Sequence, residues 1–281
     1  MAVTRVDYSE QAVAAAHSVL LELVHLLGEY RDSIVLIGGM VPRLLIPQAE
    51  EAHIGTLDVD LALDHRRFEE AGYRTVHELL TSRGYERDDQ QPFIYRRRFN
   101  LEGRPVTVQV DLLSGEYGGT GRSRRTQRVQ DVRPRKARGA DLAFEQPLDV
   151  EISGALPDGG EDKASVRVAT IVPFLIMKGM ALRDRLKEKD AYDIYYCLRH
   201  YPGAPDTILD AFGPYVENKL VKEGLECIGE KFASPDHVGP KHVADFLEIG
   251  NSADREQLQR DAYERAAHVL ENLGLKPQKV D

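Results

Sequence analysis

Two aspartates alternate with apolar residues in the segment HIGTLDVDLAL, residues 53–63. Successive side chains of a β-strand point to opposite faces, so Asp58 and Asp60 share one face and the neighbouring leucines and valine share the other. Residues i and i+2 lie roughly 6.5–7 Å apart along a strand, which allows both carboxylates to reach one cation. The simpler interpretation is an edge strand with a solvated polar face. The pattern therefore indicates chemistry only together with further groups.

A third aspartate and a glycine pair extend this pattern. Asp111 lies on the polar face of a second expected strand, residues 105–113. Upstream, the apolar run 33–37 ends in Gly38-Gly39, after which MVPRLL begins a helix. Backbone N–H groups at such a turn bind phosphate, and Mg²⁺ prefers carboxylates together with substrate phosphates. Because two-metal sites activate an attacking oxygen and stabilise a leaving one, these residues indicate nucleotidyl transfer from an NTP.

The elements that must position these residues follow from hydrophobic periodicity and from breaks in the chain. They are helices over 9–30 and 66–83, strands over 33–37, 92–99 and 105–113 beside the D-x-D strand, short strands up to about residue 170, and helices over 171–186, 188–200, 205–214, 216–231, 238–248 and 253–273. Ser9 is the expected N-cap of the first helix. The expected fold is α+β, with a sheet-containing domain over residues 1–170 and a helical domain over residues 171–281.

The composition excludes several classes of protein. The chain has 281 residues, of which 42% are hydrophobic, so it can bury a sizeable core. Its two cysteines, Cys197 and Cys227, form no C-x-x-C motif, which argues against a disulfide framework or a zinc site. The N-terminus has no apolar signal-peptide core, and no apolar run reaches 18 residues. We expect a soluble cytoplasmic protein with no membrane segment.

Positive charge is concentrated in one segment of an acidic chain. The net charge is −9, yet residues 115–138 contain eight basic and two acidic residues, a local charge of +6. Such a patch favours a polyanionic partner. We expect residues 118–139 to form an exposed excursion that begins just after Asp111 and holds RNA through its phosphates. The alternative is that these arginines pair with acidic groups of the same chain.

Three motifs in this order resemble a known superfamily. GGMVPR, TLDVDL and VQVDLL are similar to the glycine turn, the h-D-h-D-h strand and the third aspartate of nucleotidyltransferases of the polymerase-beta type. KGMALRDRLKEKDAYDIYYCL, residues 178–198, resembles the Lys-x-x-Ala…Arg…(Arg/Lys)-Asp-x-x-Asp block of the AbiEii/AbiGii toxin family. The resemblance spans about residues 30–200. It implies a nucleotidyltransferase-like mixed sheet, a toxin with a possible antitoxin partner, and RNA, with tRNA favoured, as the acceptor.

The chain departs from these patterns at three positions. Met40 stands where the family often has Ser or Thr after the double glycine, which puts in question a side-chain hydroxyl at the phosphate. Lys189 replaces the commoner Arg before Asp-x-x-Asp. The chain also resembles the GG-x-V-R-D motif of CCA-adding enzymes, but Pro42 follows Val41 and breaks that motif.

The helical block carries charges whose spacing allows two interpretations. Lys178 and Arg185 are seven residues apart on one helix face and can clamp a triphosphate together with the glycine turn, or they can form a solvated side. Asp190 and Asp193, at i and i+3, can stabilise the helix N-terminus or hold these two cations in place. Arg43, one turn into the helix after the glycines, can contact the nucleotide or form a surface ion pair.

Two functions are consistent with these residues. In the first, the chain is an enzyme that moves a nucleoside monophosphate from NTP to an acceptor hydroxyl and releases pyrophosphate. The acceptor is an RNA or tRNA 3′ end, a protein side chain or a small molecule, and the toxin-family resemblance and the basic segment favour the RNA 3′ end. Asp58, Asp60 and Asp111 then hold Mg²⁺, and Asp111 also accepts the proton. In the second, a catalytically silent nucleotidyltransferase-like fold binds RNA or a partner protein. The three intact carboxylates favour the enzyme because they repel one another unless they are used. His53 and His65, which flank the strand, are expected to be surface residues.

Overall fold

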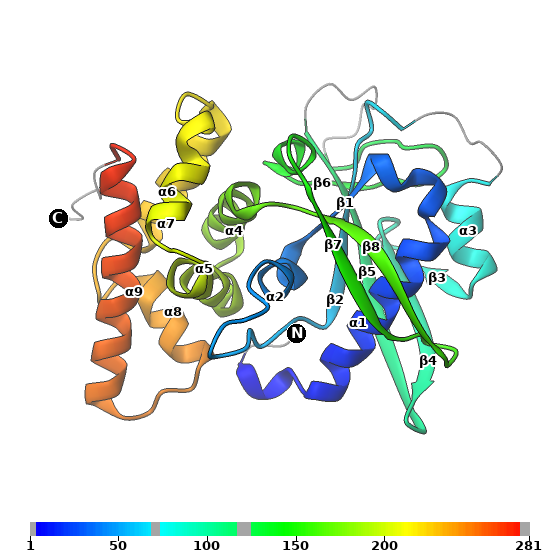
Figure 1. Cartoon of the computed structure of the whole chain (residues 1–281), viewed down its shortest axis with the longest axis horizontal. Coiled ribbons are helices and arrows are strands. Elements are labelled where there is room, and N and C mark those ends of the chain that lie inside the picture. The colour runs from blue at the N-terminus through cyan, green and yellow to red at the C-terminus, as the bar shows by residue number, and fades with distance from the viewer. Residues whose placement is uncertain (1–3, 69–73, 117–124, 276–281) are drawn as a thin grey trace. The chain divides into compact units, whose positions relative to one another are not determined.

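The chain folds into two compact units, each of which is described by itself. The computed structural model describes residues 4–68, 74–116 and 125–275. The sheet unit is formed by the described parts of 9–44 and 55–170. The helical unit is formed by residues 4–8, 45–54 and 171–275, so two short segments from early in the chain join the C-terminal helices (Figure 1).

The sheet unit is built on one mixed sheet, which has eight strands in the described ranges. The strands are β1 (Ile34–Ile37), β2 (Asp58–Leu63), β3 (Tyr85–Arg87), β4 (Ile94–Leu101), β5 (Arg104–Ser114), β6 (Arg135–Lys136), β7 (Leu148–Ala155) and β8 (Glu161–Val168), and the α-helices are α1 (Glu10–Leu26), α2 (Val41–Leu45) and α3 (Val76–Ser82). The order across the sheet is β3-β4-β5-β2-β1-β8-β7, with β6 paired to β5. β2 is parallel to β5 and antiparallel to β1, and the α+β class expected from the sequence is confirmed.

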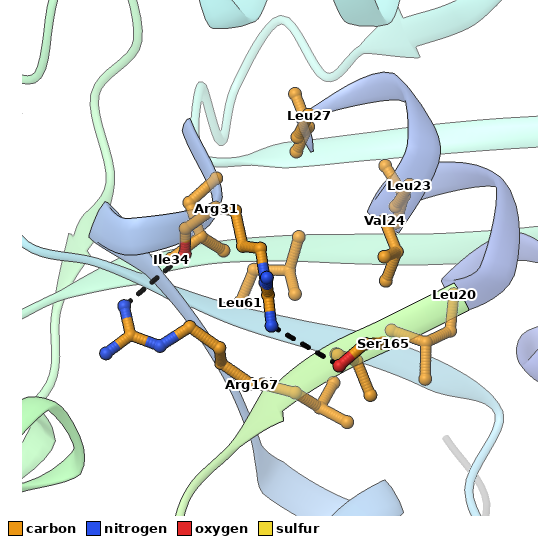
Figure 2. Close-up of a pocket in the computed structure, with 11 residues that line it drawn as sticks. Leu20, Leu23, Val24, Leu27, Arg31, Ile34, Leu61, Ser165 and Arg167 are labelled. Atoms are coloured by element: carbon orange, nitrogen blue, oxygen red, sulfur yellow. Dashed lines mark hydrogen bonds between the residues drawn. The ribbon is translucent and has the colours of Figure 1, made fainter. Parts of the chain in front are cut away.

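One face of the sheet is covered by α1. The helix begins after Ser9, whose Oγ accepts a hydrogen bond from a backbone N–H three residues on at 3.2 Å, which confirms the expected N-cap. Leu20 and Leu23 of α1 are buried and, with Leu61 of β2, line an apolar crevice that has arginine and serine side chains among its other lining residues (Figure 2). Side chains alternate along β2, so Asp60, next to Leu61, points to the face opposite α1.

Two segments of the sheet unit differ from the expectation. The helix expected over 66–83 is confined in the described residues to α3, and residues 69–73 lie outside them. It begins after Thr75, which caps it in a reciprocal capping box, whereas Arg66 lies in a turn because its backbone N–H bonds to Asp64 Oδ1 at 3.1 Å. In the second segment, the short strands expected before residue 170 form one hairpin of two eight-residue strands, β7 and β8. β3 is an additional strand without a counterpart in the expectation.

The helical unit follows the expected boundaries closely. Its α-helices are α4 (Ile171–Arg185), α5 (Glu188–His200), α6 (Asp206–Phe212), α7 (Lys219–Lys231), α8 (Val238–Phe246) and α9 (Ser252–Asn272). α4 and α7 approach closely at two glycines, since a Cβ on Gly179 would lie 2.6 Å from the carbonyl oxygen of Gly224. Within the described part of the chain, no helix is both long and apolar enough to cross a membrane.

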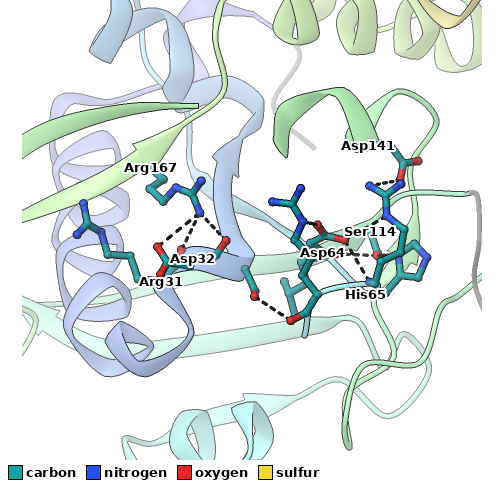
Figure 3. Close-up of polar contacts among 11 residues, drawn as sticks. Arg31, Asp32, Asp64, His65, Ser114, Asp141 and Arg167 are labelled. Carbon is teal, nitrogen blue, oxygen red and sulfur yellow. Dashed lines mark hydrogen bonds and ion pairs between the residues drawn. The ribbon is translucent and has the colours of Figure 1, made fainter. Parts of the chain in front are cut away.

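Polar contacts tie the ends of β2 and β5 together. Ser114, the last residue of β5, is fully buried, and its Oγ donates to the carbonyl oxygen of Leu63 on β2 at 2.7 Å. His65 Nδ1 lies 3.0 Å from the same Oγ. Just beyond, Arg66 forms ion pairs with Asp64 and Asp141, each at 3.3 Å (Figure 3). These contacts support the register in which the two strands pair.

We predict that Ser114→Ala lowers the free energy of unfolding by about 1–2 kcal/mol, because the buried carbonyl of Leu63 loses a hydrogen bond. Urea titration at constant pH measures the change. Ser153→Ala, at an exposed serine of β7, is the matched control and should change stability by less than about 0.5 kcal/mol. Equal stability of the two variants would show that the Ser114 contact contributes nothing.

Candidate active site

The three aspartates lie on one face of the sheet, opposite α1. In the parallel pairing of β2 with β5, Asp60 lies directly beside Asp111, and Asp58 beside Gln109. Gln109 Nε2 donates to Asp111 Oδ1 at 3.0 Å. The sequence predicted that each strand carries its carboxylates on a polar face, and the register brings the two faces together.

The glycine turn lies against these carboxylates. Ile37, the last residue of β1, pairs with Asp60, and a 3₁₀ turn over residues 38–40 follows it. Gly38 has φ +76°, and a Cβ there would lie 1.9 Å from Asp60 Oδ2. Only glycine combines this backbone conformation with so close an approach, so the turn and the carboxylate form one structure.

Thr56 is a candidate site residue that the sequence interpretation missed. A Cβ on Gly39 would lie 2.9 Å from Thr56 Oγ1, so the threonine side chain packs directly against the turn. Met40, which follows the double glycine, offers no hydroxyl group. Thr56, from the segment before β2, places a hydroxyl group at the same turn. Its position two residues before Asp58 was the available signal. Arg43 is exposed and lines a small pocket with Met40 and Thr56. The other walls of this pocket include Val13, His17 and Leu20 of α1, so the pocket lies on the α1 side of the sheet and not on the carboxylate face.

The carboxylate cluster raises the pKa of one of its members. Burial, followed by the charges of Asp60 and Asp58, raises the pKa of Asp111 from 3.8 to about 7, while the charge of Arg135 acts in the opposite direction. At Asp111, burial and the repulsion from Asp60 and Asp58 thus outweigh the effect of Arg135. Such a site gains from a bound cation.

Two of the three carboxylates are the kind of donor that Mg²⁺ prefers. Among the described residues, no group of three His, Cys, Asp or Glu side chains converges closely enough to hold a metal ion by itself. Mg²⁺ is commonly held by one or two carboxylates, with water and substrate phosphates completing its shell. Asp60 and Asp111, as direct neighbours on one sheet face, are suited to that arrangement, with Asp58 next to them along β2.

The expectation of an exposed excursion over 118–139 is wrong for the described part of that segment. Residues 125–139 fold back on the sheet: β6 pairs with β5, and Val129 and Val132 are 2% and 1% exposed. The segment lies on the sheet because the apolar side chains between its arginines, such as Val129 and Val132, are buried there. The arginines of this described stretch that are exposed are Arg125, Arg128 and Arg133, while Arg135 and Arg138 are half-buried. Residues 117–124 lie outside the described residues.

The helical unit holds the other predicted site residues in a buried ion-pair network. Lys178 Nζ donates to Asp190 Oδ1 at 2.8 Å and lies 2.7 Å from Asp193 Oδ2, where the angle makes the contact an ion pair rather than a hydrogen bond. Arg185 donates twice to Asp190, at 2.7 and 2.8 Å. Burial lowers the pKa of Lys178, but the two aspartates outweigh burial and the net pKa is raised. Lys178 is therefore charged.

Two further residues complete this network. Lys189 and His53 both bond to Asp193, His53 through Nε2 at 2.9 Å. Burial, followed by the charge of Lys189, lowers the pKa of His53 to about 4, so the imidazole is neutral at pH 7. The expectation that His53 is a surface residue is wrong: the histidine is 4% exposed. Nothing in its local sequence signals this burial, because its partner lies on a distant helix.

We predict that Asp111→Asn stabilises the Mg²⁺-free protein, and increasingly so as the pH rises from about 4 to about 7. Folding raises the pKa of Asp111, so the folded wild type holds a proton that the unfolded chain has lost, and its stability falls with pH across that range. In Asp111→Asn this carboxyl group is absent, so the variant does not lose stability with rising pH for this reason. Its advantage over the wild type should reach about 2 kcal/mol at pH 8, since solvent screens part of the repulsion.

Urea titrations at several pH values, in the presence of EDTA, measure this difference. Asp89→Asn, at an exposed loop aspartate, is the control and should show no such trend. A difference between Asp111→Asn and wild type that stays constant from pH 4 to pH 8 would contradict the prediction.

Comparisons with known proteins gave matches that cover most of the chain. The family model described as nucleotidyl transferase AbiEii toxin, type IV TA system, matches residues 23–275. Among solved structures, MenT4, a nucleotidyltransferase toxin from Mycobacterium tuberculosis H37Rv, matches 97% of this chain and 94% of its own, with 14% sequence identity and a TM-score of 0.38. Comparison with curated proteins gave no match. Because the family model covers most of its length, the chain belongs to the AbiEii family and is a nucleotidyltransferase.

Proposed function

We propose that this nucleotidyltransferase moves a nucleoside monophosphate from NTP to a hydroxyl of RNA, with tRNA favoured as the acceptor, and that it depends on Mg²⁺. The observation that supports this best is the pairing of Asp60 with Asp111 beside the turn at Gly38. It combines a carboxylate pair for a metal ion with backbone N–H groups for phosphate on one sheet face.

In this proposal each residue of the sheet unit has a defined task. Asp58, Asp60 and Asp111 hold Mg²⁺, which supplies positive charge to the phosphates and lowers the pKa of the attacking hydroxyl. The Gly38-Gly39 turn donates backbone hydrogen bonds to the triphosphate. Asp111 also accepts the proton of the acceptor hydroxyl, as the carboxylate next to the attacking oxygen.

Lys178 and Arg185 remain proposed contacts of the triphosphate, on the strength of the sequence block they share with the family. Lys178 Nζ donates a hydrogen bond to Asp190 and forms an ion pair with Asp193, and we propose that another of its three hydrogens bonds to a phosphate oxygen. The two aspartates then act indirectly, by holding the cations in place. Arg43, which follows the glycine turn in α2, remains a proposed contact of the same nucleotide because of its place in the sequence.

The proposed partners follow from the family and from the basic segment. A toxin of a type IV toxin–antitoxin system has an antitoxin, and we propose a cognate antitoxin protein for this chain. The exposed Arg125, Arg128 and Arg133 support RNA as the acceptor, because guanidinium groups bind phosphate in a bidentate manner. NTP and RNA are both abundant in the cytoplasm, where we propose that the protein acts.

The division of labour between the parts of the chain is also a proposal. The sheet unit, which corresponds to the expected domain over residues 1–170 without residues 4–8 and 45–54, carries the proposed metal ligands. The helical unit carries the lysine–arginine block. Incubation of the protein with each labelled NTP and total RNA, followed by identification of the labelled product, tests the reaction and names both substrates.

We predict that Asp60→Asn lowers the rate of nucleotide transfer at least about a hundredfold, because the charge that holds the cation is lost while the shape is kept. Asp89→Asn is again the matched control and should leave the rate unchanged. Thermal unfolding of both variants shows whether the fold is intact. Transfer by a folded Asp60→Asn variant at the wild-type rate would disprove the metal site.

We predict that Thr56→Val raises KM for NTP about fivefold, the equivalent of about 1 kcal/mol, because a hydroxyl at the glycine turn is replaced by a methyl group of the same shape. Steady-state kinetics with saturating acceptor measure the change. Thr107→Val, at an exposed threonine of β5, should leave KM as it is. An unchanged KM in Thr56→Val would remove the hydroxyl from nucleotide binding.

A further inference from the structure

Arg135 shares the sheet face of the three carboxylates. β6 runs parallel to β5 and pairs Arg135 with Leu113 and Lys136 with Ser114. Paired residues of neighbouring strands point to the same face, and Leu113 is two residues from Asp111, so Arg135 lies on the carboxylate face and Lys136 on the other. Strand geometry puts the Cα atoms of Arg135 and Asp111 roughly 8 Å apart.

Among the described residues, the surroundings of Arg135 leave one of its buried donors without a hydrogen-bond partner. Its guanidinium carbon lies 5.6 Å from the centroid of the Phe93 ring, a cation–π contact that orients the side chain. Its Nε is buried and has no hydrogen-bond partner among the described residues. A buried donor of this kind is costly unless something bonds to it. Its charge also lowers the pKa of Asp111, so the two side chains interact electrostatically.

The strand order shows on which side of the carboxylate pair Arg135 lies. The glycine turn follows β1, Asp60 lies on β2, Asp111 on β5 and Arg135 on β6, which pairs with β5 at the edge away from β2. Arg135 and the glycine turn therefore lie on opposite sides of the carboxylate pair. In an in-line displacement the attacking and leaving oxygens also lie on opposite sides of the phosphorus.

We propose that Arg135 binds a phosphodiester of the acceptor RNA, next to the hydroxyl that attacks the nucleotide. This inference rests on the proposed function, in which the triphosphate lies at the glycine turn. A guanidinium group matches phosphate with two parallel hydrogen bonds. The exposed arginines earlier in the same segment, Arg125 and Arg128, extend the positive surface for further phosphates of the strand.

The test compares Arg135→Gln, Arg135→Lys and the control Lys136→Gln. The control removes the same charge from the adjacent residue on the opposite face. Steady-state kinetics give KM for RNA and KM for NTP separately, and RNA binding is measured over a range of salt concentrations. Arg135→Gln should raise KM for RNA at least about tenfold, leave KM for NTP unchanged and reduce the salt slope of RNA binding by about one unit. Arg135→Lys should retain the salt slope and recover part of KM.

Several outcomes overturn this assignment. If Arg135→Gln raises KM for NTP instead, the arginine contacts the triphosphate. If it lowers kcat and shifts the pH profile with KM for RNA unchanged, it acts only through Asp111. If Lys136→Gln has the same effect as Arg135→Gln, the position on the carboxylate face is irrelevant. Failure of the wild type to label any RNA, or labelling of protein instead, refutes the proposed acceptor itself before Arg135 is considered.

Discussion

The parallel pairing of β2 with β5 is the constraint on which the site depends. It places Asp60 beside Asp111, and two carboxylates so close would separate if their strands were free to do so. Backbone hydrogen bonds, the apolar residues on the α1 face and the buried Ser114 at the strand ends resist that separation. The glycine turn, Thr56 and Arg135 each derive their place from this pair of strands.

Local periodicity explains how much of the site was visible in the sequence. Alternation along a strand assigns Asp58, Asp60 and Asp111 to polar faces, and a double glycine after an apolar run indicates a turn. Neither pattern contains the register between strands that are about fifty residues apart. For that reason the packing of Thr56 against Gly39, and the position of Arg135 on the carboxylate face, became apparent only from the structure.

The elements that the sequence did not locate correctly also depend on contacts between residues that are far apart in the chain. The helices of the C-terminal half have continuous apolar stripes and were located to within a few residues, whereas β7 and β8 are rich in charge and gain their order mainly by pairing with each other. His53 reads as an isolated polar residue, yet it is buried against Asp193, a partner 140 residues away. Val129 and Val132 are apolar residues in an arginine-rich segment that was expected to be exposed. Their burial is enough to fold this segment onto the sheet.

The discontinuous make-up of the helical unit has a consequence for how such a protein arises in evolution. His53 reaches Asp193 from a ten-residue segment, 45–54, that is encoded between two parts of the sheet unit. A gene fragment for residues 171–281 alone would lack this histidine, and Asp193, which is fully buried, would lose one of its bonding partners. Simple end-to-end gene fusion therefore cannot transfer the complete helical unit. Recombination within this family should therefore keep the segment for residues 45–54 together with that for residues 171–281.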